Sequence, residues 1–530
     1  MNLTKNHITF ISEDGKVDPY NLRIFLELQG FCLFQSNSDR KVNKELLFND
    51  NGVLKSYNST ELRRWITTSL ESIEEDVDDL IRVWIKYPDT TLKSSVIDHM
   101  TVYSVEEYPD TKQLETFRDT QNECYLKFRN GVVKITELGN ESMSYEELDG
   151  AIWESEIIPR DYGDNGSSDD SPFKTFIEKS VLVKDHSIET IDWREQFKPS
   201  KESEETLMSL KTGLGYLIHG FKNPKDAVAV LLMDRNASPG TANGGNGKSL
   251  ILSSLQHLVK TATQGGKSFR TDPNGGGRFQ FTNVDYDTKL VNINDLRPDF
   301  KLETLYNIIT DDMEVERKGK DKFVIPSDKS PKVCASTNYI PLLDGRSDER
   351  RQHLIEIGDY WGTALDNDST IEEELGKLLF KNDFTQTDWD NFFFFMIECV
   401  QSYLKYGLVK TTSTSYEWKS LVVKIEGQDG DGEVVNWMDK WISQNLGNAI
   451  TEVALFNDFR KDFPFINDWD EKRLHKGINT FAMNHKDYDY NSHLKKNGDT
   501  MTQRRWRTSA SNGQLLKFII TRNNPLNLVA

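Results

Sequence analysis

A glycine-rich stretch that ends in lysine and serine lies between an apolar segment and an amphipathic one. The stretch, SPGTANGGNGKSLI, spans Ser238–Ile251, and the apolar segment AVAVLLMD spans Ala227–Asp234. A short apolar run is typical of a buried strand, whereas KSLILSSLQHLVK has the spacing of a helix. Between a strand and a helix, glycines allow backbone N–H groups to curl around phosphates. The sequence therefore predicts a phosphate-binding loop in an α/β protein.

The loop departs from the strict pattern at one position. That pattern has glycine five residues before Gly247, where this chain has Ala242, flanked by Gly240 and Gly244. The alternative is an ordinary glycine turn, which has no need of lysine and serine at a helix start. The interpretation as a nucleotide site predicts ATP and Mg²⁺ as cofactors, with lysine reaching the β/γ-phosphates and serine ligating Mg²⁺. The expected nucleotide-binding residues are Gly244, Gly245, Asn246, Gly247, Lys248, Ser249 and Leu250.

Two further apolar segments end in polar residues. TKLVNINDL (288–296) contains Asp295 near its end, and PKVCASTN (331–338) ends in Asn338. Buried strands that alternate with helices favour a parallel sheet covered on both faces. We expect Asp295 to reach the Mg²⁺ beside Ser249, and Asn338 to orient water or touch the γ-phosphate. The alternative for Asp295 is a turn cap, and asparagine commonly ends strands.

Composition excludes several classes of protein. The 530 residues are 37% hydrophobic and 28% charged, with a net charge of −19, so nucleic acid is not expected to coat the whole surface. No apolar run approaches the roughly 20 residues of a membrane helix, and MNLTKNHITFISEDGK has no signal-peptide core. Four widely spaced cysteines contain no CxxC pair, which argues against a zinc ribbon. A cytoplasmic protein with no membrane partner is expected.

Two polar, glycine-rich runs, at 161–172 and 426–433, are interpreted as linkers. In the first region, residues 71–86 are expected to form one amphipathic helix, and Asn130-Gly131 a hairpin turn. The predicted organisation is an α+β N-terminal domain (1–165), an ATPase core (173–360), a helical extension (361–425) and a winged-helix-like domain (434–530).

The C-terminal region has the order helix, helix, hairpin that a winged-helix domain shows. EVALFNDFRKDF and EKRLHKGINTFAMN are the expected helices, HLKKNGDTMTQRRWRT the basic hairpin, and LLKFIITR a final strand. Contacts of such a hairpin to the phosphates of DNA give affinity without sequence specificity. A wing that docks on protein is the alternative. The DNA-binding candidates are Lys495, Lys496, Arg504, Arg505 and Arg507.

Together these motifs resemble the superfamily 3 helicases, compact AAA+ P-loop ATPases, and most closely their D5-like branch of phage and viral primase-helicases. Lys248 and Ser249 match motif A, Asp295 matches motif B and Asn338 matches motif C. The stretches GLGYLIHG, SPKVCASTNYIPLLDGRSDERR and DWDNFFFFMIECVQSYLKYGL also resemble that branch, and FRNGVVKIT resembles its N-terminal region. One departure is Asn294, where the family often has an acid; Asp299 or a neighbouring subunit is a possible substitute for it.

The resemblance also implies an assembly and a substrate. An arginine after motif C acts on the adjacent subunit's nucleotide, which makes Arg350 the candidate, with Arg351 beside it, and implies a hexameric ring. The alternative is that both are ordinary surface arginines. In this family a basic hairpin binds the DNA phosphates in the central pore. Here the candidate residues of that hairpin are Lys318, Lys320 and Lys322, and the alternative is a hairpin that is only solvated. The expected partners are single-stranded and forked DNA, and a separate primase or polymerase.

Three functions are weighed. The first is an ATP-dependent, ring-forming helicase that moves on single-stranded DNA in phage or viral replication. The second is an AAA+ initiator or loader that remodels DNA without processive unwinding. The third is a DNA-binding scaffold with a degenerate ATPase, which Asn294 makes conceivable. No strand-borne acidic pair with a histidine is found in the first 170 residues, so no primer synthesis is expected of this chain.

Overall fold

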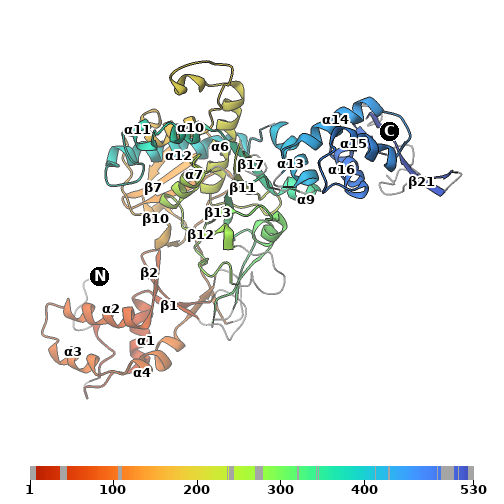
Figure 1. Ribbon diagram of the computed structural model, residues 1–530. Coiled ribbons are helices and arrows are strands. Elements are labelled where there is room, and N and C mark those ends of the chain that lie inside the picture. The colour runs from red at the N-terminus through yellow and green to blue at the C-terminus, as the bar shows by residue number, and fades with distance from the viewer. Residues whose placement is uncertain are drawn as a thin grey trace.

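The computed structural model shows a mixed α/β chain in three parts (Figure 1): an N-terminal part, a central part and a C-terminal part on the far side of the central one. It describes residues 7–12, 14–35, 44–104, 110–235, 237, 244–268, 279–318, 322–341, 343, 345–411, 414–427, 430–485, 488–490, 506–510 and 513–522.

The N-terminal part is built on a mixed six-stranded sheet in the order β5-β4-β1-β2-β3-β9. Its helices are amphipathic and bury Leu22, Leu62 and Trp84 against the sheet and one another. The elements are α1 (Pro19–Leu28), β1 (Phe31–Phe34), β2 (Glu45–Asp50), β3 (Val53–Tyr57), α2 (Ser59–Glu71), α3 (Asp78–Ile85), α4 (Asp89–Ser95), β4 (Val102–Ser104), β5 (Lys112–Gln113) and β9 (Ile152–Trp153).

A second sheet, β10-β6-β7-β8, packs on the central part rather than on the first sheet. It contains β6 (Cys124–Phe128), β7 (Gly131–Thr136), β8 (Gly139–Met143) and β10 (Ile157–Ile158). β6 and β7 pair antiparallel with Phe128 opposite Gly131, so the hairpin predicted at Asn130-Gly131 is confirmed. Phe128 is fully buried and meets Phe393 edge to face, with ring centroids 4.9 Å apart.

The central part is organised around a five-stranded sheet in the order β12-β13-β16-β11-β17, and every pair in it is parallel. All six residues of β11 and all six of β16 are buried, as expected where both faces are covered. The strands are β11 (Ala229–Asp234), β12 (Thr261–Gly265), β13 (Leu290–Leu296), β16 (Lys332–Thr337) and β17 (Gln352–Ile357). The three strands predicted from apolar runs are therefore confirmed as β11, β13 and β16.

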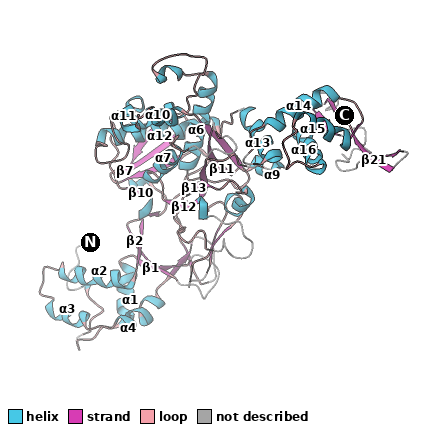
Figure 2. Cartoon of the chain, viewed as in Figure 1, coloured by secondary structure: helices cyan, strands magenta, loops and turns pink. Residues whose placement is uncertain are grey.

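Helices lie beside this sheet (Figures 1 and 2). α6 and α12 pack so closely that a Cβ on Gly215 would clash with the carbonyl of Cys399. The helices are α5 (Pro172–Ser180), α6 (Lys201–Ile218), α7 (Lys248–Ser254), α8 (Tyr306–Ile309), α9 (Gly345–Arg350), α10 (Tyr360–Asp366), α11 (Ile371–Leu375) and α12 (Gln386–Tyr406). The next helix, α13 (Thr414–Glu426), packs into the core of the C-terminal part through Leu421, Val422 and Ile425. A short antiparallel pair, β14 (Met313–Val315) and β15 (Phe323–Ile325), precedes β16.

The C-terminal part has its own core, which includes Trp437, Trp441, Phe459 and Phe481. Its two predicted helices are confirmed as α15 and α16, and strands follow them. The elements are α14 (Glu433–Asn445), β18 (Ile450–Thr451), α15 (Glu452–Asp462), α16 (Glu471–Asn484), β19 (Tyr488–Tyr490), β20 (Trp506–Ala510), β21 (Gly513–Phe518) and β22 (Ile520–Arg522). β20 and β21 pair antiparallel, whereas the predicted turn at Asn497-Gly498 lies outside the described residues.

The prediction of one helix over residues 71–86 is wrong. α2 ends at Glu71, and α3 begins only at Asp78. The carboxylate of Asp76 accepts a hydrogen bond from the backbone N–H of Asp78 at 3.2 Å, which favours a new helix start over continuation. Ile73 and Val77 are nevertheless buried, because the connecting segment itself packs into the core.

The segment predicted as a linker at 161–172 is held against α12. The backbone N–H of Ser167 donates to Oδ1 of Asn391 at 2.8 Å, and Nδ2 of Asn391 donates to the carbonyl of Asp170 at 3.2 Å. Tyr162 stacks on Phe394 with ring centroids 5.6 Å apart. The segment therefore joins its flanking parts through fixed contacts rather than as a free tether.

Candidate functional site

A pocket of about 420 Å³ opens at the edge of the five-stranded sheet where its strands end. In parallel sheets, ligands bind outside the carboxyl ends of the strands. Ten residues from the segment before α7, from α7 itself and from the ends of β13 and β16 line it: Gly244, Gly245, Asn246, Gly247, Lys248, Ser249, Leu250, Asp295, Ser336 and Asn338. All seven predicted nucleotide-binding residues, together with Asp295 and Asn338, thus lie at one pocket.

The backbone of the loop requires glycine. Gly245 has φ +108° and Gly247 has φ +82°, which residues with a Cβ rarely adopt. A Cβ on Gly247 would also lie 2.6 Å from Cζ of Phe176. Phe176 stacks on Trp361, whose Nε1 donates to Oγ of Ser180 at 2.9 Å. The loop is therefore supported from behind by an aromatic wall, and its open side faces the pocket.

Lys248 forms a buried ion pair with Asp234, the last residue of β11. The two side chains are 5% and 3% exposed. Burial lowers the pKa of Lys248, and the neighbouring Asp234 carboxylate opposes that shift. Asp234 was not among the residues predicted for the site. Its signal was present, because Asp234 ends a buried apolar run just as Asp295 nearly does.

Asn246 connects Asp234 to α10. Its Nδ2 donates to Oδ1 of Asp234 at 2.9 Å, and its Oδ1 accepts from the backbone N–H of Gly362 at 2.9 Å. A Cβ on Gly362 would lie 2.5 Å from that oxygen. The position of the phosphate-loop residue Asn246 is thus fixed from two sides, by a strand end and by a helix.

Asp295 lies at an irregularity in β13. The register between β13 and β16 shifts between Ile293 and Leu296, and Asp295 itself has φ +60°. Such bulges redirect a side chain. The Asp295 side chain is 35% exposed and forms an ion pair with Nζ of Lys267 at 2.8 Å, while its backbone N–H donates to Oγ of Ser336 at 3.2 Å. Lys267 and Ser336 were not predicted, because nothing local in the sequence links them to Asp295.

Asn294 and Asp299 differ from Asp295 in their surroundings. Oδ1 of Asn294 is buried and has no hydrogen-bond partner. Asp299 is exposed and paired with Arg297, with Nε 2.9 Å from Oδ1, and does not line the pocket. Among the described residues, no cluster of three or more His, Cys, Asp or Glu side chains forms a metal site. The two oxygen ligands predicted for a cation, Ser249 and Asp295, both line the pocket, together with the oxygen-bearing side chains of Asn246, Ser336 and Asn338.

The two candidate arginines differ in their contacts within the chain. Arg351 lies over the ring of Tyr306, 4.3 Å from its centroid, and its Nε donates to Oγ1 of Thr310 at 3.3 Å. Arg350, at the end of α9, is exposed, and within the described part of the chain it makes no ion pair. Of the two, Arg350 is the one available to another molecule.

The predicted basic hairpin corresponds to β14 and β15. Lys318 is exposed, Nζ of Lys322 lies 3.1 Å from Oε1 of Glu314, and Lys320 lies outside the described residues. Arg317 fixes the hairpin's base: its guanidinium pairs with Asp285 and donates through Nη2 to the carbonyl of Val284 at 2.7 Å. Of the C-terminal basic candidates, Lys495, Lys496, Arg504 and Arg505 lie outside the described residues, and Arg507 is described only as part of β20.

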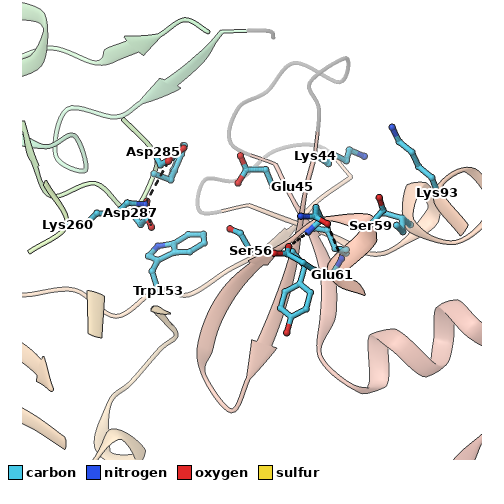
Figure 3. Close-up of a pocket in the computed structure, with 15 residues that line it drawn as sticks. Lys44, Glu45, Ser56, Ser59, Glu61, Lys93, Trp153, Lys260, Asp285 and Asp287 are labelled. Atoms are coloured by element: carbon cyan, nitrogen blue, oxygen red, sulfur yellow. Dashed lines mark hydrogen bonds and ion pairs between the residues drawn. The ribbon is translucent and has the colours of Figure 1, made fainter. Parts of the chain in front are cut away.

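A second pocket of about 540 Å³ lies where the N-terminal part meets the loop 285–287 (Figure 3). Trp153 lies beside Asp285 and Asp287, and Lys44 and Lys93 lie on the side away from the central part. Asp287 is neutralised there, because Nζ of Lys260 lies 2.6 Å from Oδ1. This pocket carries none of the predicted site residues.

No helix among the described residues is long and apolar enough to cross a membrane.

Comparison with known proteins gives a match to a family of unknown function (DUF5906) over residues 241–351. That range is less than half of the chain and contains Lys248, Asp295, Asn338 and Arg350. No curated protein matches the chain. A solved structure titled "The A form apo structure of NrS-1 C terminal region-CTR" is 11% identical, with a TM-score of 0.40, over 95% of this chain and 100% of that one. A likeness at that level carries no argument about fold or function.

Proposed function

We propose that this chain is an ATP-dependent DNA helicase with a superfamily 3-like AAA+ core, which acts as a hexameric ring in phage or viral genome replication. The observation that carries the proposal is the pocket in which the glycine loop, Lys248, Ser249, Asp295 and Asn338 meet. These residues come from three separate chain segments, and each was expected from its sequence motif before their proximity was known.

The residues fit a nucleotide with its cation. Gly247 allows the loop to lie directly against Phe176, and the other side of the loop lines the pocket. Ser249 and Asp295 offer the oxygen ligands that Mg²⁺ prefers. Bound Mg²⁺ would neutralise charge on the phosphates. Lys248 would bind the β/γ-phosphates, and Asn338 would orient the attacking water. The hydroxyl of Ser336 would hold Asp295 in place, because it accepts a hydrogen bond from the backbone N–H of Asp295.

The exposed Arg350 supports a ring. An arginine that makes no ion pair with the described residues of its own chain is free to enter a neighbour's pocket. Guanidinium suits phosphate recognition because it is planar and permanently charged. Lys318 and Lys322 on the hairpin would contact the DNA backbone. A C-terminal winged-helix domain would add further phosphate contacts through its basic residues.

ATP hydrolysis with and without single-stranded DNA tests this proposal. We expect DNA to stimulate turnover and Lys248→Ala to reduce it by at least about 100-fold, as removal of one charge-stabilising donor does. Arg350→Ala should reduce turnover by about 10³-fold, the scale of an arginine finger. Arg351→Ala, at an arginine held within its own chain, should reduce it less.

Mixing the two variants tests the shared site. A ring that contains both Lys248→Ala and Arg350→Ala subunits has some pockets with an intact lysine and an intact neighbouring arginine, so part of the activity should return. No recovery on mixing would count against a shared site. Strand displacement on a forked duplex then separates a helicase from a loader that only remodels DNA.

A scaffold with a degenerate ATPase is the second candidate. It is favoured by Asn294 at the position where an acid is expected, and by the ion pair between Asp295 and Lys267. Asn294→Asp distinguishes the two: a rise in turnover would show that the natural residue limits hydrolysis. Turnover that is absent, and insensitive to DNA, in the natural protein would favour the scaffold.

A further inference from the structure

A small cavity of about 40 Å³ lies at the opposite, amino-terminal edge of the five-stranded sheet. Lys260 directly precedes β12 and Lys289 directly precedes β13. The other walls come from the end of α6, the segment 117–119 and β6. The lining residues used below are Arg118, Lys127, Glu156, Lys260 and Lys289.

Three of the four cations at this cavity have a partner. Nζ of Lys127 lies 3.0 Å from Glu156, and Nζ of Lys289 lies 2.7 Å from the same carboxylate. Lys260 is neutralised by Asp287, the pair drawn in Figure 3. Arg118 differs from these three: within the described part of the chain its guanidinium makes no hydrogen bond and no ion pair within 4 Å. Burial lowers the pKa of Arg118, which reflects this poorly solvated position.

The surroundings of the cavity have more positive than negative charge. Two further buried lysines lie behind it and donate to carbonyl oxygens: Lys332 to Tyr216 at 2.7 Å, and Lys222 to Ile308 at 2.6 Å. Burial lowers the pKa of each of these two lysines to about 7. The interacting group has five basic side chains, Arg118, Lys127, Lys222, Lys289 and Lys332, against three carboxylates, Asp119, Glu156 and Asp328. Because Lys222 and Lys332 are only partly charged near neutral pH, the excess of positive charge is small.

Asp119 does not serve as the partner that Arg118 lacks. Its carboxylate accepts the backbone N–H of Tyr125 at 3.1 Å and that of Gly220 at 2.6 Å, so both oxygens are used to join the second sheet to the end of α6. A guanidinium has five N–H donors in a planar fork, and because Arg118 is half-buried its charge is less well solvated than at the surface, which is costly. A ligand that supplies oxygens and negative charge would remove that cost.

We propose that this cavity is a binding site for a small tetrahedral oxyanion of the phosphate type, with Arg118 as its main ligand. The planar guanidinium matches two phosphate oxygens at once, which lysine cannot do. The size of the cavity limits the ligand, because small-molecule pockets that take a nucleotide are about 300 Å³ or larger. Leu126, Ile218 and Leu258 form apolar walls, so the polar contacts of the cavity come from the charged side chains around Arg118.

Calorimetric titration with inorganic phosphate, in a buffer without other oxyanions and at constant ionic strength, tests the site. We expect saturable binding by the full chain and a 10- to 100-fold weaker Kd for Arg118→Gln, the loss typical of a charge-assisted hydrogen bond. Arg82→Gln is the matched control, since Arg82 is 73% exposed on α3 and should leave the Kd unchanged. Thermal denaturation with phosphate against chloride gives a second readout if Arg118→Gln is less stable.

The Lys248→Ala variant separates this site from the phosphate loop. The cavity is supported as the site if Lys248→Ala binds phosphate with the wild-type Kd and Arg118→Gln binds it more weakly. The inference would be overturned if Lys248→Ala lost phosphate binding while Arg118→Gln kept it. It would also be overturned if the natural protein showed no saturable binding, which would mean that water alone fills the cavity. The inference does not depend on the proposed helicase function.

Competition identifies the source of the phosphate. A short oligonucleotide with a 5′-phosphate that displaces inorganic phosphate, when its unphosphorylated form does not, would indicate a terminal phosphate as the natural ligand. If neither oligonucleotide competes, the ligand is the free anion.

Discussion

The carboxylate of Asp234 faces two side chains of the glycine loop and is almost completely buried. One carboxylate oxygen pairs with Nζ of Lys248 and accepts a hydrogen bond from Nδ2 of Asn246. The other oxygen has no hydrogen-bond partner. Such a group is tolerated only because the lysine charge compensates it, and removal of one member of a buried pair commonly costs about 3–5 kcal/mol. Asp234 therefore fixes the geometry of the residues that the proposed nucleotide would meet.

Asp234→Asn should lower both stability and ATP turnover. The change keeps the shape of the side chain but leaves the charge of Lys248 uncompensated, so we expect a loss of about 3 kcal/mol and a clear fall in melting temperature. Asp226→Asn, at an exposed position just before the same strand, is the matched control and should change stability by less than about 0.5 kcal/mol. Equal effects of the two substitutions would contradict a special role for Asp234.

α10 is a short helix whose backbone reaches the loop. The N–H of Gly362 holds Asn246, and the neighbouring Trp361 forms part of the wall behind Gly247. Neither residue lines the pocket, so α10 acts on the site through its contacts with the loop.

Gly362→Ala is expected to impair ATP turnover, although the residue does not line the pocket. In most helices this substitution stabilises by about 1 kcal/mol, because alanine has the higher helix propensity. Here the added Cβ would lie 2.5 Å from Oδ1 of Asn246, so the expected sign is reversed. Thr363→Ala on the same helix is the control. A higher melting temperature and unchanged turnover in Gly362→Ala would show that the loop does not depend on this contact.

Across the whole molecule, Glu156 joins the second sheet to the five-stranded one. It lies just before β10, and its carboxylate pairs with Lys127 of β6 and with Lys289 at the start of β13. Burial alone would raise its pKa, but the two lysines hold the pKa of Glu156 at about 2, below its ordinary 4.5. A depressed folded pKa stabilises the fold above pH 4.5, and that stabilisation, about 3 kcal/mol, is lost as the pH falls toward 2.

The melting temperatures of the natural protein and Glu156→Gln should therefore converge in acid. We expect a large difference at pH 6 and a progressively smaller one between pH 5 and pH 3, measured in a buffer without phosphate. Glu154→Gln is the matched control, because Glu154 is 58% exposed in its pair with Lys55. A difference that stays constant with pH would mean that the variant is destabilised by packing rather than by loss of charge.

Much of the candidate site could be predicted because its signals are local. Glycines, a lysine and a serine between a strand and a helix occupy consecutive positions, and Asp295 and Asn338 are marked by the apolar runs that they follow. Asp234 has the same mark, because it ends the apolar run of β11. Lys267, Ser336 and Gly362 were not predictable in this way, because each acts through a contact with a residue far away in the sequence.

The sequence by itself determined β11, β13 and β16 of the central sheet and the helix start after the glycine loop, because hydrophobic periodicity and glycine positions act over a few residues. Only the tertiary structure decided the strand order β12-β13-β16-β11-β17, which brings three chain segments to one pocket. Only in the tertiary structure is the helix predicted over 71–86 interrupted, and only there do the cations around Arg118 lie together at the opposite edge of the sheet. These outcomes depend on burial and on charges brought together from distant segments. A local sequence pattern contains no information about burial by distant segments or about the charges that they bring.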